Sequence, residues 1–474
     1  MRIGIKATTL LLTGALVGVL SACGADGGGA GANDASRGGA GGKGAADVPL
    51  TSKITVPEAF DAGKGWEVRA DWLPEGQPFP YAASPKSGRI AYLDKTGQGY
   101  VLNVREAASG RLLATSKPWA APKLTEEQSK EYTSALAVPR IALISGGDRE
   151  YFAVWARGEQ RKDELHDYKE ALSAAFYPAD ASGKGVAPAG AGNVAAPDSG
   201  FGSHLGVFPG AGGLLVMSFS DSVLISPDGK VTDNGDAEVS IAGKKAKPEY
   251  TMTFPGRDGL VTTAKHPGNG HGGFGVDGGW DSSKATPPGV EPTLEYDSVV
   301  NAKEQVPNGH LVGAAGDFLI AGWGKGREDV SSVHESATGK VRATAPCGTP
   351  DTDYLAVVPK VTDRNQVPPA VSPSGRYLVK GGNVFDLETG KGVCADAGED
   401  AKEITLASVG DDGTAYGIAG EDAPRTPVSV SAATGAAKPL SEKTVTPDAM
   451  AKGAGVFVTH AGQDTVHLIV LTLR

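Results

Sequence analysis

The chain has 474 residues, with 68 glycines and 31 prolines, and its 45 basic and 55 acidic side chains give a formal net charge of -10. Nucleic acid and anionic membrane surfaces are poor partners for such a chain, because both require a clustered basic face. The acidic balance favours solubility and identifies no ligand.

The N-terminus has the layout of a secretory signal. Arg2 and Lys6 precede an uncharged, mostly apolar run over Ala7–Leu20, and small residues follow. That order predicts a signal peptide over residues 1–22. The apolar run is short for a membrane helix, which needs about 20 apolar residues, so we expect no transmembrane segment in the mature chain.

The residues Leu20-Ser21-Ala22-Cys23 resemble a lipobox, the site at which bacterial lipoproteins are lipidated on the cysteine thiol and cleaved just before it. The resemblance implies lipid on Cys23 and an address on the outer face of the cell membrane. Two acyl chains suffice for stable anchoring. The alternative is an ordinary signal peptide that happens to contain a cysteine.

Residues 23–48 are mostly glycine and alanine and contain no aromatic side chain. Such a segment buries too little surface to offset its ordering entropy. It predicts a flexible tether with a root-mean-square reach of roughly 25 to 30 Å, which holds residues 49–474 clear of the membrane.

Two further cysteines, Cys347 and Cys394, remain as an even pair. In an oxidising compartment, a disulfide between them is the default expectation. It would stabilise the fold by about 4 kcal/mol on the chain-entropy model. Two buried free thiols are the alternative.

From about residue 50 the chain is rich in short apolar runs separated by turn residues, which is typical of β-structure. A Ser-Pro-x-(x)-Gly turn, two strands and a Ser/Thr-Gly turn recur in the same order. Related units cover Phe79–Thr115, Pro139–Val186, His204–Thr232, Tyr250–Ser282, Gly309–Thr344, Ala370–Val393 and Ile404–Leu440. Units of this length are typical of propeller blades.

Strands near both chain ends could form one further unit that closes the ring and removes exposed sheet edges. The repeated turns resemble those of the bacterial YVTN, Tol-type and quinoprotein-like propellers. The resemblance implies an all-β fold, a single β-propeller, with eight blades favoured and seven possible. It carries over no catalytic residues, and no unit has the Trp-Asp dipeptide of WD repeats.

Two segments interrupt the repeat. Residues 124–136 offer Thr125 and Gln128 as a capping box for a short helix. Residues 158–177 are densely charged and could extend a strand or form a helical excursion; a solvated surface loop is the simplest interpretation.

The most suggestive polar stretch is Ala264–Ser283, which we predict to be a loop between strands. Its candidate ligand-contacting residues are His266, His271, Asp277, Trp280 and Asp281. Imidazole and carboxylate groups can bind a transition metal, but this spacing specifies no ligand geometry, so we predict no metal site.

Catalytic signatures are weak. The sequence has no Gly-x-Ser-x-Gly elbow and no phosphate-binding glycine loop before a helix. We therefore nominate no catalytic residue and no cofactor. The sequence favours a lipoprotein propeller that binds a cell-envelope protein, a glycan or a small ligand; the alternative is a secreted enzyme, quinoprotein dehydrogenase-like or glycan-cleaving.

Overall fold

The computed structural model describes residues 48–74, 77–122, 138–146, 148–160, 165, 169–195, 206–217, 222–234, 238–246, 248–265, 271–288, 290, 309–324, 330–348, 367–395, 402–420, 425–461 and 465–474. Regular structure in these residues is almost entirely β-strand, with one short 3-10 helix, η1 (Ser282–Lys284). No helix in this part of the chain is long and apolar enough to cross a membrane. The predicted signal peptide, Cys23, nearly all of the tether and the helix at 124–136 lie outside the described residues.

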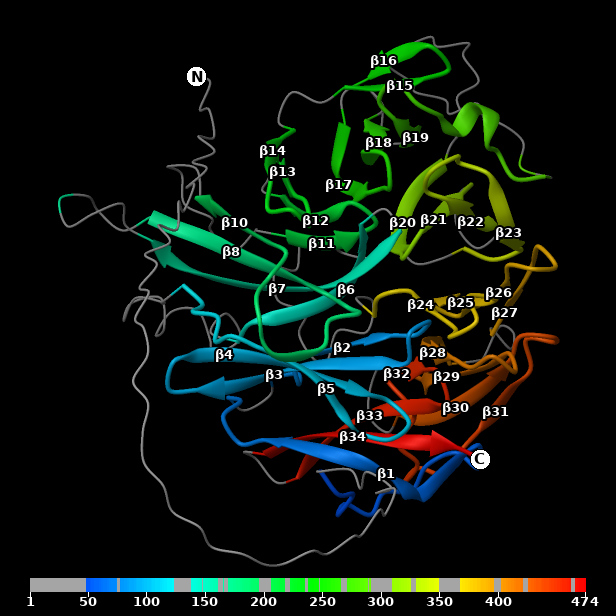
Figure 1. The fold of residues 1–474 in the computed structure, drawn as a ribbon. Helices are drawn as coiled ribbons and strands as arrows, with labels where there is room; N and C mark the ends of the chain where they lie inside the picture. Colours follow the sequence, from blue (N-terminus) through cyan, green and yellow to red (C-terminus); the bar gives the residue numbers. More distant parts are fainter. Residues whose placement is uncertain are drawn as a thin grey trace, which may run out of the picture.

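Antiparallel sheets follow one another in chain order (Figure 1). Sheet I contains β2 (Tyr81–Ser84), β3 (Arg89–Thr96), β4 (Gly99–Glu106) and β5 (Leu112–Ser116). Sheet II contains β6 (Arg140–Gly146), β7 (Arg149–Gln160), β8 (Lys169–Pro178) and β10 (Gly190–Ala195). Sheet III contains β11 (Gly206–Gly210), β12 (Gly213–Met217), β13 (Ser222–Ile225) and β14 (Val231–Asp233).

Sheet IV has three strands, β17 (Pro248–Pro255), β18 (Leu260–Lys265) and β19 (His271–Val276), and a separate hairpin of β15 (Val239–Ile241) and β16 (Lys244–Ala246) precedes it. Sheet V contains β20 (Gly309–Ala315), β21 (Phe318–Trp323), β22 (Val330–Glu335) and β23 (Val341–Ala345). Sheet VI contains β24 (Ala370–Val371), β25 (Tyr377–Lys380), β26 (Asn383–Asp386) and β27 (Lys391–Cys394). A parallel bridge between β23 and β27 joins sheets V and VI.

Sheet VII contains β28 (Ile404–Val409), β29 (Thr414–Ala419), β30 (Thr426–Ser431) and β31 (Ala437–Pro439). The last sheet, called here the terminal sheet, combines both ends of the chain: β32 (Ala449–Ala451), β33 (Ala454–Ala461), β34 (Thr465–Leu473) and then β1 (Phe60–Ala70) at its outer edge. The predicted pairing of N- and C-terminal strands is therefore present.

Neighbouring sheets pack face to face through apolar side chains. Trp66 and Leu468 of the terminal sheet share one buried cluster with Ile90 of sheet I, and Val379 of sheet VI shares another with Leu406 of sheet VII. Burying a large apolar side chain stabilises the fold by about 2 to 3 kcal/mol, so these interfaces hold the array together. Successive meander sheets that bury both faces in this way form a β-propeller architecture, as the sequence predicts.

The repeated Ser/Thr-Gly turn between third and fourth strands is confirmed. The amide of Gly110 donates to the carbonyl of Glu106 at 2.9 Å, and the amide of Gly390 donates to that of Asp386 at the same distance. The two glycines have φ of 71° and 76°. Glycine adopts this left-handed conformation without steric cost, which explains its recurrence at the position.

Sheet II departs from the predicted unit Pro139–Val186. The strand β9 (Gly183–Val186) leaves this unit and pairs in parallel with β5 of sheet I, and the outer strand of sheet II is β10. The described part of the charged segment 158–177 is a strand extension, because β7 and β8 pair as far as Gln160 and Lys169.

Candidate functional site

Several of the longest connections between strands lie at the same end of the sheets. At one end, called the turn end, first and second strands are joined by residues 85–88, 211–212 and 316–317. At the other, called the loop end, residues 117–139, 161–168 and 346–369 join successive strands. Long connections on a rigid scaffold are where binding residues concentrate, so the loop end is the candidate functional face.

Contacts between sheets tie the turn end together. The Ser145 hydroxyl of sheet II donates to Oδ1 of Asp317 in sheet V at 3.3 Å. Arg257 of sheet IV forms an ion pair of 2.8 Å with Asp148 of sheet II. An exposed ion pair contributes little stability, yet it shows that turns of sheets II, IV and V meet here.

The candidate ligand residues of Ala264–Ser283 do not form one loop. His266 lies outside the described residues, while His271 begins β19 and Asp277 follows its last residue. Six strand steps of roughly 3.3 Å separate these positions by about 20 Å. The stretch predicted as a loop is thus a strand followed by η1, with His271 at the loop end and Asp277, Trp280 and Asp281 at the turn end.

Trp280 and Asp281 are engaged in local packing. The indole Nε1 of Trp280 donates to the carbonyl of Ser336 at 3.0 Å, and its ring lies edge to face with Phe274 at 6.0 Å. Asp281 caps η1 by accepting the amide of Ser283 at 2.8 Å. Over the described residues, no group of three histidine, cysteine or acidic side chains could hold a metal ion.

A different polar group lies at the loop end, where the terminal sheet meets sheet I. Asp448 immediately precedes β32 and accepts the amide of Val458 at 2.7 Å. Solvent reaches its side chain, yet the surrounding protein desolvates the carboxylate and raises its pKa to about 6. Burial raises the pKa of Tyr81 well above its usual value, and the charge of Asp448 adds to this shift.

Further aromatic and acidic side chains lie nearby, since Trp72 packs against the same buried cluster as Tyr81. The rings of Trp72 and Tyr100 lie 5.5 Å apart. Burial raises the pKa of Asp94, and the neighbouring charge of Asp71 raises it further. Hydrogen bonds from backbone amides, including that of Lys95 to Asp94, partly offset these shifts, and among the described residues no basic side chain lowers either pKa.

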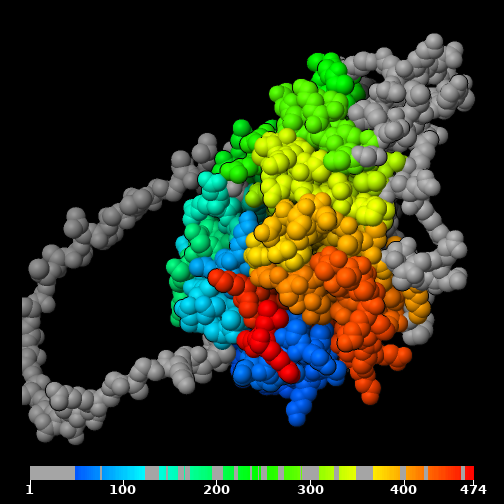
Figure 2. Space-filling model, turned by 90° about the vertical axis from the view of Figure 1, so that its right-hand side faces the viewer, coloured from blue at the N-terminus to red at the C-terminus, as the bar shows by residue number. Residues whose placement is uncertain are grey.

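We call these six residues the loop-end wedge: Asp71, Trp72, Tyr81, Asp94, Tyr100 and Asp448. On the surface, the C-terminal strand in red lies between the N-terminal residues in blue and sheet I in cyan (Figure 2). Carboxylates beside aromatic faces can accept hydrogen bonds from hydroxyl groups and attract cations. No pattern in the sequence indicated this group, because its members lie in ordinary strand and connection residues, several of them far apart in the chain.

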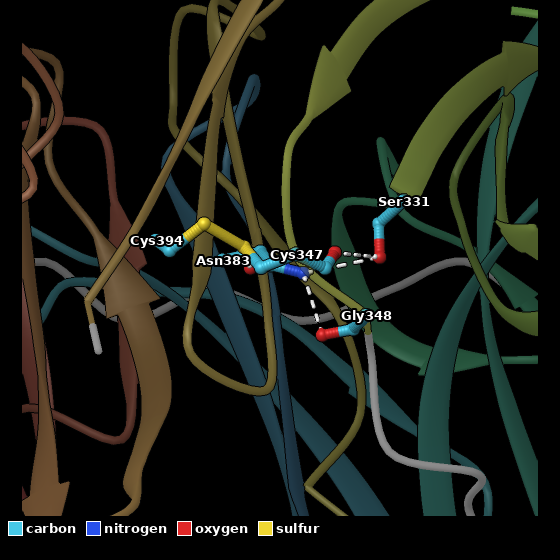
Figure 3. Close-up of a disulfide and its surroundings, with 5 residues drawn as sticks. All are labelled: Ser331, Cys347, Gly348, Asn383 and Cys394. Atoms are coloured by element: carbon cyan, nitrogen blue, oxygen red, sulfur yellow. Dashed lines mark hydrogen bonds between the residues drawn. A yellow bond between two sulfur atoms is a disulfide. The ribbon is translucent and has the colours of Figure 1, made fainter. Parts of the chain in front are cut away.

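The two cysteines predicted to pair lie together. A disulfide joins Cys347, just after β23, to Cys394, the last residue of β27, with Cα atoms 6.3 Å apart (Figure 3). It therefore links sheet V to sheet VI beside their parallel bridge.

No protein-family model matches the chain, and no curated protein matches it. Similar solved structures include the Dos1 propeller, at 10% identity and a TM-score of 0.38, over 86% of this chain and 95% of that one. Hsv2 from Kluyveromyces lactis matches at 8% identity and 0.33, over 84% and 98% of the two chains. TolB from Acinetobacter baumannii matches at 13% identity and 0.25, over 68% and 61%. At these identities and TM-scores, no activity or partner of those proteins is transferred to this chain.

Proposed function

We propose that the chain is a membrane-anchored, extracytoplasmic binding module, an eight-bladed propeller held by lipid on Cys23. Its loop end presents a surface to a protein, glycan or small ligand of the cell envelope. The long connections 117–139, 161–168 and 346–369, which all lie at this end, carry this proposal. A face built from long connections on a rigid ring is suited to binding.

The blade count is supported by contacts between first strands. These run from β32 through β2, β6, β11 and β17 to β20, and from β24 through β28 back to β32. Sheets V and VI supply the remaining link through a shared core that includes Ile320 and Phe385. The N-terminal strand β1 then completes the terminal sheet, a closure that leaves no open sheet face between the chain ends.

The contacts of the first described residues indicate where a tether would join the propeller. Thr51 and Ser52 donate their amides to the buried carboxylate of Glu67 at 3.0 and 2.6 Å. Two residues before Thr51, Pro49 pairs with Trp66 of β1. A tether over residues 23–48 would thus reach the propeller at the outer edge of the terminal sheet.

The loop-end wedge supplies the chemistry of the contact. The half-buried pair Trp72 and Tyr100 offers apolar faces, and Asp94 and Asp448 offer carboxylates without a basic partner among the described residues. A sugar or an amine-bearing group is suited to such a surface, because its hydroxyl or ammonium donors meet the carboxylates while its apolar side stacks on the rings.

Photocrosslinking in intact cells tests the binding face. A photoreactive amino acid replaces Lys95, exposed at the loop end, or Lys340, exposed at the turn end. We expect discrete adducts from position 95 and none from position 340. Equal adducts from both positions, or adducts from position 340 alone, would contradict the proposal. Turnover of a glycan by the purified protein would favour the enzymatic alternative.

Membrane fractionation tests the anchor separately. The variant Cys23→Ala should appear in the soluble fraction, because removing the acylated thiol removes the acyl chains. The double variant Cys347→Ser/Cys394→Ser is the matched control and should stay with the membrane. If Cys23→Ala also stays there, the lipid anchor is wrong, whatever the crosslinking experiment shows.

A further inference from the structure

Three residues of sheet VI form one lateral row at the loop end. Lys380 of β25 pairs with Asn383 of β26, and Asn383 pairs with Cys394 of β27. Side chains of directly paired residues project from the same face of a sheet, about 4.8 Å apart from strand to strand. All three therefore face sheet V, on the same side as the buried Leu378 and Phe385.

The outer part of this row holds the chain where it leaves sheet V. Cys394 is bonded covalently to Cys347, and the Nδ2 group of Asn383 reaches the carbonyl of Gly348 at 3.5 Å and the hydroxyl of Ser331 at 3.2 Å (Figure 3). The Ser331 hydroxyl in turn donates to the carbonyl of Cys347 at 2.8 Å. Residues 347 and 348 are thus fixed on sheet VI, just before the connection 349–366.

Lys380, at the inner end of the row, holds the chain where it enters sheet VI after the connection 349–366. The ammonium group of Lys380 donates to the carbonyl of Val367 at 3.0 Å, and the lysine is only 4% exposed. Burial lowers its pKa to about 8. A buried amine is costly unless it is hydrogen bonded, so this contact with Val367 has a structural consequence. It fixes the far end of the same connection.

We propose that Lys380, Asn383 and Cys394 form a clamp that holds both ends of the connection 349–366, and that the disulfide is its redox-sensitive half. A thiolate of an external dithiol attacks the disulfide, forms a mixed disulfide and releases one cysteine thiolate. The second thiol of the reagent then displaces the other cysteine. The reagent is oxidised to its disulfide, and the protein gains two electrons and two protons as two thiols.

Opening of the clamp is confined to one side of sheet VI. After the disulfide is reduced, one parallel bridge still joins β23, the strand before Cys347, to β27. In this bridge the amide of Thr344 donates to the carbonyl of Gly390 at 3.3 Å. The apolar core between sheets V and VI remains at the other end of the strands. On the opposite face of sheet VI, the amide of Leu406 still donates to the carbonyl of Gly381 at 2.9 Å.

Amide hydrogen exchange of the full chain, before and after dithiothreitol treatment, tests this clamp. We expect exchange at Thr344 to rise about tenfold or more on reduction, while exchange at Leu406 stays unchanged, because only the disulfide side opens. Unchanged exchange at Thr344 after complete reduction would overturn the proposal. An equal rise at Leu406 would do so as well, since it would indicate general unfolding.

Variants separate the two halves of the clamp. Cys347→Ser/Cys394→Ser should show the raised Thr344 exchange without dithiothreitol and no further response to it. Lys380→Met keeps the disulfide and should leave Thr344 exchange low until the reagent is added. A double cysteine variant that exchanges like the oxidised parent at Thr344 would refute the redox role.

Discussion

Trp66 and Trp280 make the same contact with the sheet that follows each of them. The indole of Trp66 donates to the carbonyl of Ala107 at 2.8 Å, and that of Trp280 donates to the carbonyl of Ser336 at 3.0 Å. Ala107 and Ser336 hold the same position in the repeated Ser/Thr-Gly turn. Each tryptophan ring therefore lies against the turn of the next sheet and fixes the spacing between the two sheets.

The turn glycine beneath each ring leaves room for it. A Cβ added to Gly339, whose φ is 70°, would lie 2.3 Å from the ring of Trp280. Gly453 has a similar φ of 77°, but a Cβ there would meet nothing within 4 Å. The two positions therefore share the conformational requirement for glycine and differ in the contact.

We expect Gly339→Ala to destabilise the protein more than Gly453→Ala. Both variants incur the left-handed conformation cost of about 1 to 2 kcal/mol. Only Gly339→Ala also overpacks the interface, which adds about 1 to 3 kcal/mol. Urea unfolding of the two variants measures the difference, and equal losses would show that the ring moves aside freely.

The buried carboxylate of Glu67 should make the protein sensitive to acid. Burial alone would raise the pKa of Glu67, but hydrogen bonds from Thr51 and Ser52 outweigh it and lower the pKa to about 2. A carboxyl with a lowered folded pKa stabilises the fold above its unfolded pKa, and this stabilisation is lost as the pH falls through the folded pKa. The loss should therefore occur between about pH 4.5 and pH 2.

The variant Glu67→Gln removes this acid sensitivity. We expect it to lower the free energy of unfolding by about 2 to 3 kcal/mol at pH 7 and to match the parent near pH 2. Glu442→Gln, at an exposed position, is the control and should change little. If Glu67→Gln lowers the free energy of unfolding by the same amount at pH 2 as at pH 7, the charge of Glu67 is not what stabilises the fold.

Local chemistry made the turns predictable from sequence. Gly110 and Gly390 follow serine or threonine at a fixed offset, and a turn closes within a few residues. The strand β19 was missed because its glycines hide the alternation of apolar and polar side chains, although its partners Lys265 and Asp281 lie close to it in the chain. The loop-end wedge was missed because Asp448 reaches Tyr81 only through the packing of the terminal sheet on sheet I.

Asp448 should limit stability at neutral pH. Its folded pKa of about 6 lies above the ordinary value of 3.8, so the folded state prefers the neutral carboxyl. That preference stabilises the fold below the unfolded pKa and is lost as the pH rises through about 6. Deprotonation at pH 7 therefore has a cost, which solvent access to the side chain reduces to about 1 kcal/mol.

The variant Asp448→Asn keeps an oxygen for the amide of Val458 and removes the charge. We expect a gain of about 1 kcal/mol in unfolding free energy at pH 7 and almost none at pH 3.5. Chemical unfolding at the two pH values measures it. A loss of stability at pH 7 would mean that the carboxylate has a stabilising cationic partner, which would also change the ligand chemistry proposed for the wedge.

Ala242 has an unfavourable backbone conformation in the hairpin of β15 and β16. It has φ of 51° and is followed by Gly243 with φ of 79°, and the two residues join the paired positions Ile241 and Lys244. Two-residue hairpin turns with both φ positive favour Asn-Gly, because a residue with Cβ is strained there and asparagine tolerates the conformation best.

We therefore expect Ala242→Asn to stabilise this hairpin by about 0.5 to 1 kcal/mol. Because the hairpin forms a separate two-stranded sheet, the gain should appear as slower exchange of its own amides and little change in global unfolding. Ala433→Asn, at an exposed turn position without positive φ, is the matched control and should give no gain. Only position 242 has a left-handed backbone whose strain asparagine could relieve. Equal effects at both positions would therefore show that asparagine acts through solvation.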